Sequence, residues 1–128
     1  MSRVLIVEDN PLVAKFYRMA LERAGGFTCT VTEDVEQILR EAQNGGYDLA
    51  ILDVSLSNSI HEGHPIDGIT LAKILKERLP KLPILIATAH AMSGDRERFL
   101  QSSGADGYLE KPVYDAQLLV DKVKALLK

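Results

Sequence analysis

The segment RVLIVEDNP, residues 3–11, decides the fold of this 128-residue chain. Its short, continuous run of branched apolar residues is typical of a strand that is buried on both faces. Asn10 and Pro11 follow, and they supply a helix N-cap and a proline at the first helical position. The segment therefore predicts a buried strand that passes directly into a helix, with Glu8 and Asp9 at the junction.

The same order, a short apolar run and then an amphipathic stretch, recurs along the rest of the chain. Further strands are predicted at 27–32, 49–54, 83–89 and 107–111. Helices are predicted at 11–25, 35–43, 68–79, 95–103 and 114–128. We expect Leu12 on the apolar face of the first helix and Leu118 on that of the last. The polar, turn-rich stretch at 55–66 is expected to be a loop.

Strands and helices in alternation predict an α/β fold, with a doubly wound parallel sheet covered by helices on both faces. Five strands favour an open sheet over the closed eight-stranded barrel. In open sheets of this kind, ligands bind beyond the carboxyl ends of the strands. The residues that follow each strand are therefore the first candidates for function.

Composition and charge exclude several other classes of protein. The length fits one domain, residues 1–128, which is large enough to fold without disulfide bonds or a structural metal. The single cysteine, Cys29, points to a reducing, cytoplasmic compartment, and we expect it to be a small core residue. A net charge of -3 argues against electrostatic binding to nucleic acid or to an anionic membrane. The apolar runs are too short for a membrane span or a signal peptide.

Polar side chains lie at four of the five predicted strand ends. They are Glu8 and Asp9 after the first strand, Asp53 after the third, Thr88 after the fourth and Lys111 after the fifth. Three clustered carboxylates repel one another and are costly to bury, so we expect them to hold a hard divalent cation such as Mg²⁺. Lys111 and Thr88 can contact phosphoryl oxygens beside them, which indicates a phosphoryl-transfer site. Ordinary polar residues leaving strands would explain one of these positions, but not all of them together.

At these positions the chain resembles the receiver domain of two-component response regulators, of the stand-alone single-domain type. The resemblance covers essentially the whole chain and rests on VLIVEDN (4–10), LAILDV (49–54), DGITLAKIL (67–75), PILIATA (83–89) and GADGYLEKP (104–112). It implies a flavodoxin-like (βα)5 sandwich with strand order 2-1-3-4-5. It also implies phosphorelay signalling in a bacterial or archaeal cytoplasm, with a sensor histidine kinase or a histidine phosphotransfer protein as the phosphoryl donor.

The resemblance implies a role for each residue at the strand ends. Asp53 is the expected phosphoacceptor, and Thr88 and Lys111 are expected to contact the phosphoryl group. The expected ligands of Mg²⁺, or of Mn²⁺, are Asp9, Asp53 and the backbone carbonyl of Ser55, with Glu8 holding a metal-bound water.

Further residues are implied to tune the site or to transmit its state. Ser55 and His90 would modulate dephosphorylation, and the Lys111–Pro112 peptide is expected to be cis. Thr88 and Tyr108 would act as the switch, repacking the face formed by 95–103, 107–111 and 114–128, where a downstream protein binds. The length leaves no room for a DNA-binding or enzymatic output domain, so we expect a signal that leaves through protein contacts, from a monomer or a weak phosphorylation-dependent dimer.

The segment 57–66 departs from the family pattern. Ser57 stands where receivers usually have a proline, and the segment is several residues longer than usual. His61, Glu62 and His64 could form a second metal site, although they lack the helical frame of an HExxH motif. A solvated insertion is the second interpretation, since added loop length costs little. A partner-specific loop over the rim of the site is the third, and it is the one that we favour.

Other functions compete with a phosphorylation switch. A phosphorylation-independent interaction module could keep this fold, but such receivers usually lose an acid, the acceptor or the lysine, and this chain has them all. A hydrolase or nucleotide-binding enzyme is disfavoured, because the chain lacks GxxxxGK[ST] and GxGxxG, and Ser55 replaces the second acid of a DxD acceptor motif. A flavin protein is disfavoured because no phosphate-binding loop follows the first strand. We therefore expect a phosphoacceptor switch rather than a turnover enzyme.

Overall fold

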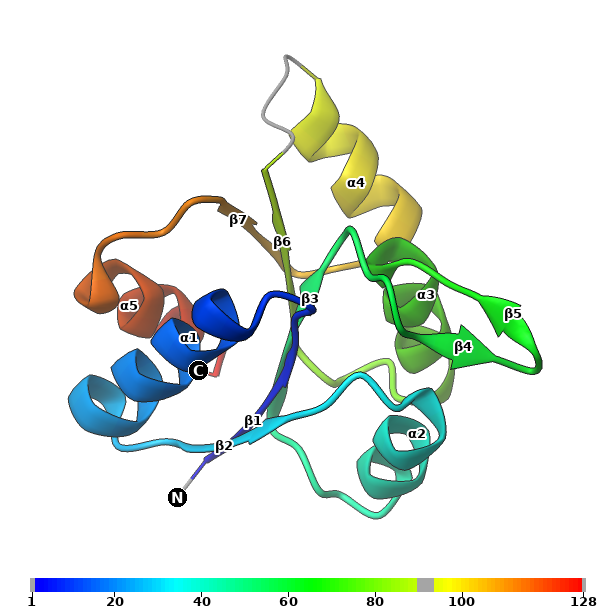
Figure 1. The fold of residues 1–128 in the computed structure, drawn as a ribbon, viewed down its shortest axis with the longest axis horizontal. Coiled ribbons are helices and arrows are strands. Elements are labelled where there is room, and N and C mark those ends of the chain that lie inside the picture. Colours follow the sequence, from blue (N-terminus) through cyan, green and yellow to red (C-terminus); the bar gives the residue numbers. More distant parts are fainter. Residues whose placement is uncertain (1, 90–93, 128) are drawn as a thin grey trace.

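The computed structural model describes residues 2–89 and 94–127, and its centre is a parallel sheet (Figure 1). The strands of this sheet are β1 (Arg3–Val7), β2 (Thr28–Val31), β3 (Leu49–Asp53), β6 (Ile84–Thr88) and β7 (Gly107–Glu110). They lie in the order β2-β1-β3-β6-β7, and each neighbouring pair is parallel. The predicted flavodoxin-like α/β fold and its strand order are confirmed.

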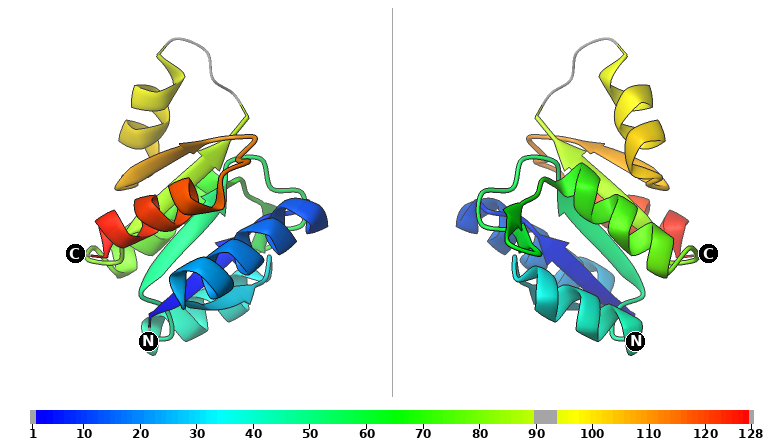
Figure 2. Two further views of the ribbon diagram at one scale, coloured as in Figure 1. Left: turned by 90° about the vertical axis from the view of Figure 1, so that its left-hand side faces the viewer. Right: turned by 90° about the vertical axis from the view of Figure 1, so that its right-hand side faces the viewer.

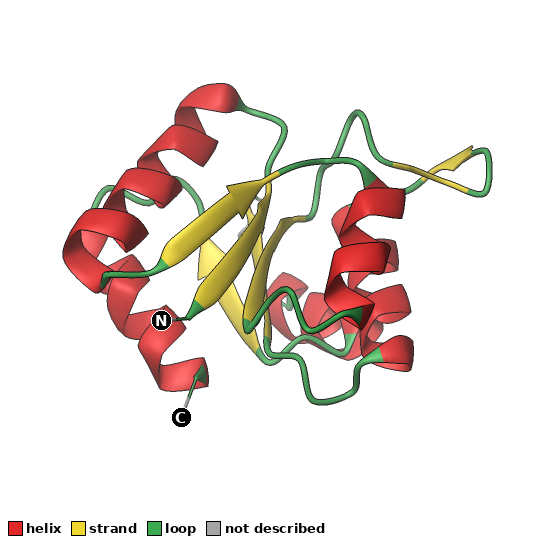
Figure 3. Ribbon diagram, turned by 90° about the horizontal axis from the view of Figure 1, so that it is seen from below, coloured by secondary structure: helices red, strands yellow, loops and turns green. Residues whose placement is uncertain are grey.

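Helices cover both faces of the sheet. They are α1 (Pro11–Gly25), α2 (Val35–Gln43), α3 (Gly68–Arg78), α4 (Asp95–Ser103) and α5 (Ala116–Leu126). α1 and α5 lie side by side on one face, and α2, α3 and α4 pack against the other (Figures 1 and 2). Seen from below, the strands form a layer between the two groups of helices (Figure 3). Among the described residues, no helix combines the length and the apolar composition that crossing a membrane requires.

The junction of β1 and α1 is short and fixed by a side-chain cap. The Asn10 side chain accepts hydrogen bonds from the backbone N–H groups of Leu12 (3.0 Å) and Val13 (3.4 Å), so it is the N-cap that the sequence predicted. Only Glu8, Asp9 and Asn10 connect the strand to the helix. The two acids are therefore held at the carboxyl edge of the sheet, whatever their mutual repulsion.

Two predictions about helix faces are wrong. Leu12 is 78% exposed and Leu118 is 47% exposed, so neither lies in the core. The buried stripe of α1 is formed by Ala14, Tyr17, Ala20 and Leu21, and that of α5 by Leu119, Val120 and Val123. Successive helical residues are about 100° apart around the axis, so Leu118 lies at the edge of the stripe that Leu119, Val120 and Val123 form. Cys29 is buried, as predicted.

Residues 55–66 contain a small hairpin where the sequence predicted only a loop. Its strands are β4 (Ile60–His61) and β5 (His64–Pro65), which pair antiparallel. Glu62 and Gly63 connect them with φ values of 51° and 82°, the positive angles that a tight type I′ turn requires. The hairpin projects from the α2 and α3 side of the molecule, as Figures 1 and 3 show. The sequence did not predict this turn, because residue 62 is a glutamate and a non-glycine residue seldom adopts a positive φ.

Gly68, the first residue of α3, lies against the backbone of Asp53. A Cβ atom at position 68 would come within 1.9 Å of the Asp53 carbonyl oxygen, and the Gly68 N–H donates to the Val54 carbonyl at 2.9 Å. Only a residue without a side chain lets α3 begin so close to the end of β3. The glycine therefore fixes the path of the backbone that carries Asp53.

We predict that Gly68→Ala lowers the free energy of unfolding by about 2–4 kcal/mol, because the new methyl group displaces the end of β3. Urea unfolding followed by circular dichroism measures the loss. Gly63→Ala is the control on the same connection, since its Cβ meets open space and only its positive φ is strained. That control should lose about 1 kcal/mol. Equal losses in the two variants would contradict the close approach at Gly68.

Candidate functional site

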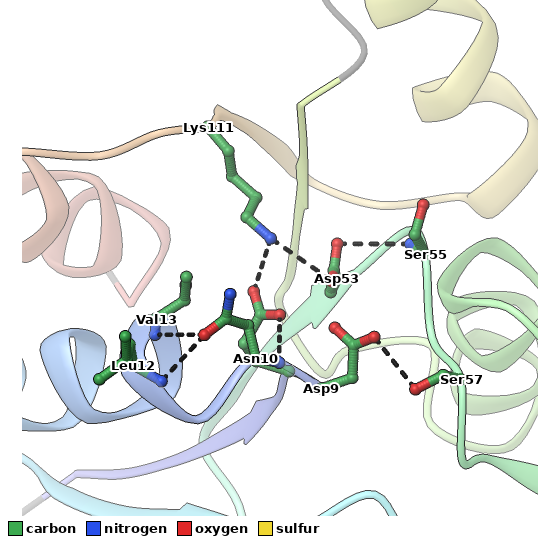
Figure 4. Close-up of polar contacts among 9 residues, drawn as sticks. Asp9, Asn10, Leu12, Val13, Asp53, Ser55, Ser57 and Lys111 are labelled. Carbon is green, nitrogen blue, oxygen red and sulfur yellow. Dashed lines mark hydrogen bonds and ion pairs between the residues drawn. The ribbon is translucent and has the colours of Figure 1, made fainter.

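Four charged residues meet at the carboxyl edge of the sheet (Figure 4). Glu8 and Asp9 follow β1, Asp53 ends β3 and Lys111 follows β7. The ligand oxygens of the three carboxylates all lie within 4.8 Å of one another. No other group of three or more potential metal-ligating side chains is this close within residues 2–89 and 94–127. The acids that the sequence placed at strand ends therefore do converge.

Lys111 lies between two of these acids. Its Nζ is 2.8 Å from Glu8 Oε1 and 3.4 Å from Asp53 Oδ2. Burial alone would lower the pKa of Lys111, but the hydrogen bond to Glu8 and the charges of both carboxylates outweigh burial and raise the pKa. The ammonium group is therefore charged throughout the physiological range, and one positive charge faces two buried carboxyl groups.

Asp53 is the acid with the most perturbed proton equilibrium. It is only 4% exposed, and its Oδ1 accepts a hydrogen bond from the Ser55 N–H at 3.3 Å. Burial raises the pKa of Asp53 to about 7, helped by the hydrogen bond and the negative charge of Glu8, while Lys111 and the Ser55 N–H act in the opposite direction. Near neutral pH, any additional positive charge beside Asp53 therefore stabilises its ionised form.

Asp9 has the opposite tendency. Burial alone would raise its pKa, but hydrogen bonds that involve Glu8, Ser57 and Asp53 outweigh burial and lower it. The Ser57 hydroxyl donates to Asp9 Oδ2 at 3.1 Å (Figure 4). Asp9 is partly exposed, whereas Glu8 and Asp53 are buried. The site thus has one partly exposed carboxyl group with a lowered pKa, Asp9, at its rim, and two buried carboxyl groups, Glu8 and Asp53, behind it.

The donor set fits a hard divalent cation. Three carboxyl groups face one ammonium group, so the cluster has an excess of negative charge when its acids are ionised. Its candidate ligands are all oxygens, the atoms that Mg²⁺ and Mn²⁺ prefer, and one of its acids opens toward the surface. The geometry supports a cation site that also has a cationic side chain within reach of a bound anion.

The remaining predicted residues lie around this cluster. Thr88 ends β6 and is buried, and its carbonyl oxygen accepts a hydrogen bond from the Lys111 N–H at 2.9 Å. The Lys111–Pro112 peptide is cis, as predicted. Tyr108 pairs in register with Ile86 and belongs to the core on the α2–α3 side. Tyr108 is thus a buried residue, only 9% exposed. His90 lies outside the described residues.

The hairpin does not assemble the second metal site that the sequence allowed. His61 and His64 are direct cross-strand neighbours, and His61 Nε2 lies 3.7 Å from Glu62 Oε1. Yet in the described part of the chain these residues do not form a group of three closely placed ligands. A structural metal site needs more ligands than this pair offers. The solvated loop and the partner-specific loop remain predictions.

Sequence reasoning missed the contact between Ser57 and Asp9. Ser57 was notable in the sequence only as a departure from the family pattern, and 48 residues separate it from Asp9. The available signal was its position four residues after Asp53, on the connection that leaves the same sheet edge. Gly68 lies in the segment DGITLAKIL (67–75), but its contact with the Asp53 backbone is visible only in the structure.

We predict that Asp53→Asn stabilises the fold at pH 8 in the presence of EDTA. Between the unfolded pKa, near 4, and the folded pKa of about 7, the folded chain binds more protons, so the contribution of Asp53 to stability falls as the pH rises. Asparagine cannot ionise, and it should gain roughly 1–4 kcal/mol at pH 8 and little below pH 4. Thermal unfolding across this pH range measures the difference. Asp121→Asn, at an exposed acid, should show no such pH-dependent gain. A lower stability of Asp53→Asn at pH 8 would mean that the pairing with Lys111 dominates.

Comparison with known proteins agrees with this geometry. The family described as the response regulator receiver domain matches residues 4–124. The transcriptional activator protein IrlR of Burkholderia pseudomallei is 40% identical over 126 residues, which are 98% of this chain and 50% of that protein. The polar-differentiation response regulator DivK of Brucella abortus is 32% identical over 126 residues, covering 97% of this chain and 94% of DivK. The chain thus spans about half the length of the IrlR relatives and nearly all of DivK.

Solved structures show the same similarity. A putative response regulator from Chloroflexus aurantiacus has a TM-score of 0.81 and 31% identity, covering 98% of this chain and 97% of that one. A CheY-like receiver domain protein from Methanospirillum hungatei has a TM-score of 0.80 and 25% identity, covering 99% and 94%. Receiver domains are the response-regulator modules of two-component phosphorelay signalling. On its sequence match, its fold and its acid cluster, the chain belongs to the response regulator receiver domain family.

Proposed function

We propose that this receiver accepts a phosphoryl group on Asp53 from the phosphohistidine of a sensor histidine kinase or a histidine phosphotransfer protein, in the presence of Mg²⁺ or Mn²⁺. The observation that supports this most strongly is the position of Asp53 inside the acid cluster, with Lys111 Nζ at 3.4 Å. A nucleophile, a cation site and a fixed positive charge are the parts that phosphoryl transfer needs.

In the proposed reaction, a carboxylate oxygen of Asp53 forms a bond to phosphorus while the P–N bond of the donor breaks. The electron pair of the broken bond stays on the histidine nitrogen, which takes a proton from solvent, so the donor leaves with a neutral imidazole. Lys111, already beside Glu8 and Asp53, would contact the phosphoryl oxygens together with the Thr88 hydroxyl. Asp9, Asp53 and the Ser55 carbonyl would hold the cation, and Glu8 would hold one of its waters. When bound, Mg²⁺ neutralises charge on the phosphoryl oxygens.

The output of the reaction is proposed to be a change of surface. Thr88 ends β6, and Tyr108 lies on the neighbouring strand β7, so a movement of Thr88 toward the phosphoryl group would alter the packing beside Tyr108. The face formed by α4, β7 and α5 would then bind a downstream protein, from a monomer or a weak phosphorylation-dependent dimer. Ser55 and His90 stay predicted modulators of dephosphorylation.

An apolar groove borders the acceptor site and is proposed to receive the phosphodonor. Its volume is about 490 Å³, and its lining includes Leu12, Phe16, Lys111, Pro112 and Tyr114. Leu12 and Tyr114 are 78% and 86% exposed. A protein donor must bring its histidine into bonding distance of Asp53, so its contact surface has to border the site, and an apolar face of a donor helix fits a groove that begins at Lys111.

We predict that acetyl phosphate with Mg²⁺ adds one phosphoryl group to the wild type, and that Asp53→Asn removes this modification because the nucleophile is lost. EDTA should remove it as well. A phosphate-affinity gel separates the modified from the unmodified protein, and Asp121→Asn is the matched control at an exposed acid. A wild type that stays unmodified, with a cognate kinase too, would instead support the phosphorylation-independent interaction module. Modification that persists in Asp53→Asn would place the acceptor elsewhere.

We predict that Leu12→Arg and Tyr114→Ala each slow phosphotransfer from a protein donor about tenfold relative to phosphorylation by acetyl phosphate, because each alters an exposed apolar side chain that lines the groove. The measurement uses histidine kinases of the source organism, autophosphorylated with radiolabelled ATP, and compares transfer rates. Leu118→Arg changes an exposed leucine outside the groove and should leave the ratio unchanged. Equal ratios in all three variants would contradict donor binding at this surface.

A further inference from the structure

We infer that Ser57 is a positioning residue of the metal site, because its hydroxyl fixes the orientation of the Asp9 carboxylate before a cation binds. The inference rests on the proposed function, since it assigns Ser57 to the cation site proposed there. It adds a residue from the β3–α3 connection to a site otherwise built from strand ends.

The first support is the way in which the three acids are held. Glu8 accepts hydrogen bonds from Lys111 Nζ and from the Asn10 N–H, at 2.8 and 3.1 Å. Asp53 is held by Lys111 and by the Ser55 N–H. For Asp9, no ion pair with a basic side chain occurs within residues 2–89 and 94–127, and its hydrogen bond from outside the cluster comes from Ser57. Ser57 therefore has for Asp9 the orienting role that Lys111 has for the other two acids.

The second support is the exposure of Asp9. A partly exposed carboxylate on a short linker can rotate, and fixing it at the moment of metal binding costs conformational entropy. The Ser57 bond at Oδ2 fixes that rotation in advance, while the other oxygen of the carboxylate can still coordinate. Partners that orient metal ligands in this way typically affect affinity strongly. We therefore expect the Ser57 hydrogen bond to raise the affinity of the site for the cation, rather than to compete with the cation for Asp9.

The third support is that Ser57 is itself well placed. Two residues further on, Ser59 is buried, and its hydroxyl donates to the Glu33 carbonyl oxygen at 3.0 Å. The Ile66 N–H donates to the Ser59 carbonyl at 2.9 Å and closes the base of the hairpin. Figure 4 shows the Ser57 side chain directed at Asp9 from the chain that leads to this hairpin. The connection is therefore anchored two residues beyond Ser57, which is itself exposed at the rim of the site.

The test measures binding of Mn²⁺ alone, from the electron paramagnetic resonance signal of the unbound ion. We expect Ser57→Ala to raise the dissociation constant about three- to tenfold, the effect of one lost orienting hydrogen bond. Ser57→Thr keeps the hydroxyl and should bind within about twofold of the wild type. The matched control is Asn58→Ala, which removes the adjacent side-chain hydrogen bond to Glu33 and leaves Asp9 untouched. Circular dichroism establishes that each variant is folded.

Each result decides the inference. Weaker binding in Ser57→Ala, with Ser57→Thr and Asn58→Ala near the wild type, supports it. Unchanged or tighter binding in Ser57→Ala overturns it, and so does an equal loss in Asn58→Ala, which would indicate a loosened connection rather than a positioned carboxylate. A wild type that binds no Mn²⁺ overturns the proposed cation site and this inference together, so the two failures are distinguishable.

Discussion

Two buried carboxyl groups share one ammonium group at the edge of this sheet, and the properties of the site depend on that imbalance. Glu8 and Asp53 are each only 4% exposed, and Lys111 contacts both. Burying a charge is costly unless it is paired, and a single lysine cannot fully compensate two carboxylates. The cost of burying this carboxylate, with Glu8 beside it, raises the pKa of Asp53. A site in this condition responds strongly to any added charge, whether a proton, a metal ion or a phosphoryl group.

The fold makes the imbalance unavoidable. Parallel strands place their carboxyl ends at one edge, and the three residues between β1 and α1 keep Glu8 and Asp9 there. Gly68 lets α3 begin against the backbone of Asp53 at the end of β3. Asp53 is therefore also held at this edge. The cores on the two faces of the sheet stabilise the strands that carry these ends. The architecture that stabilises the fold therefore also holds the carboxyl groups close together at the edge of the sheet.

The fold and most of the site were predictable because both depend on local patterns. Continuous apolar runs mark buried parallel strands, and a residue at a strand end reaches the site by topology alone. The features that the sequence did not predict depend on distant or three-dimensional relations. Ser57 meets Asp9 across 48 residues, and the exposure of Leu12 depends on which stripe of α1 meets the sheet. The proton equilibria are similar, because the pKa of Asp53 follows from burial and distances that no spacing encodes.

The base of the β4–β5 hairpin has a consequence for how such a domain diversifies. Because Ser59 and Ile66 are already hydrogen-bonded to each other, the chain between them leaves and returns at nearly one point. Residues 60–65 can therefore be shortened, lengthened or exchanged while the backbone enters α3 along the same path. A foreign peptide or a reporter grafted at the Glu62–Gly63 tip would therefore extend from the α2 and α3 side of the molecule without altering the path of the backbone into α3.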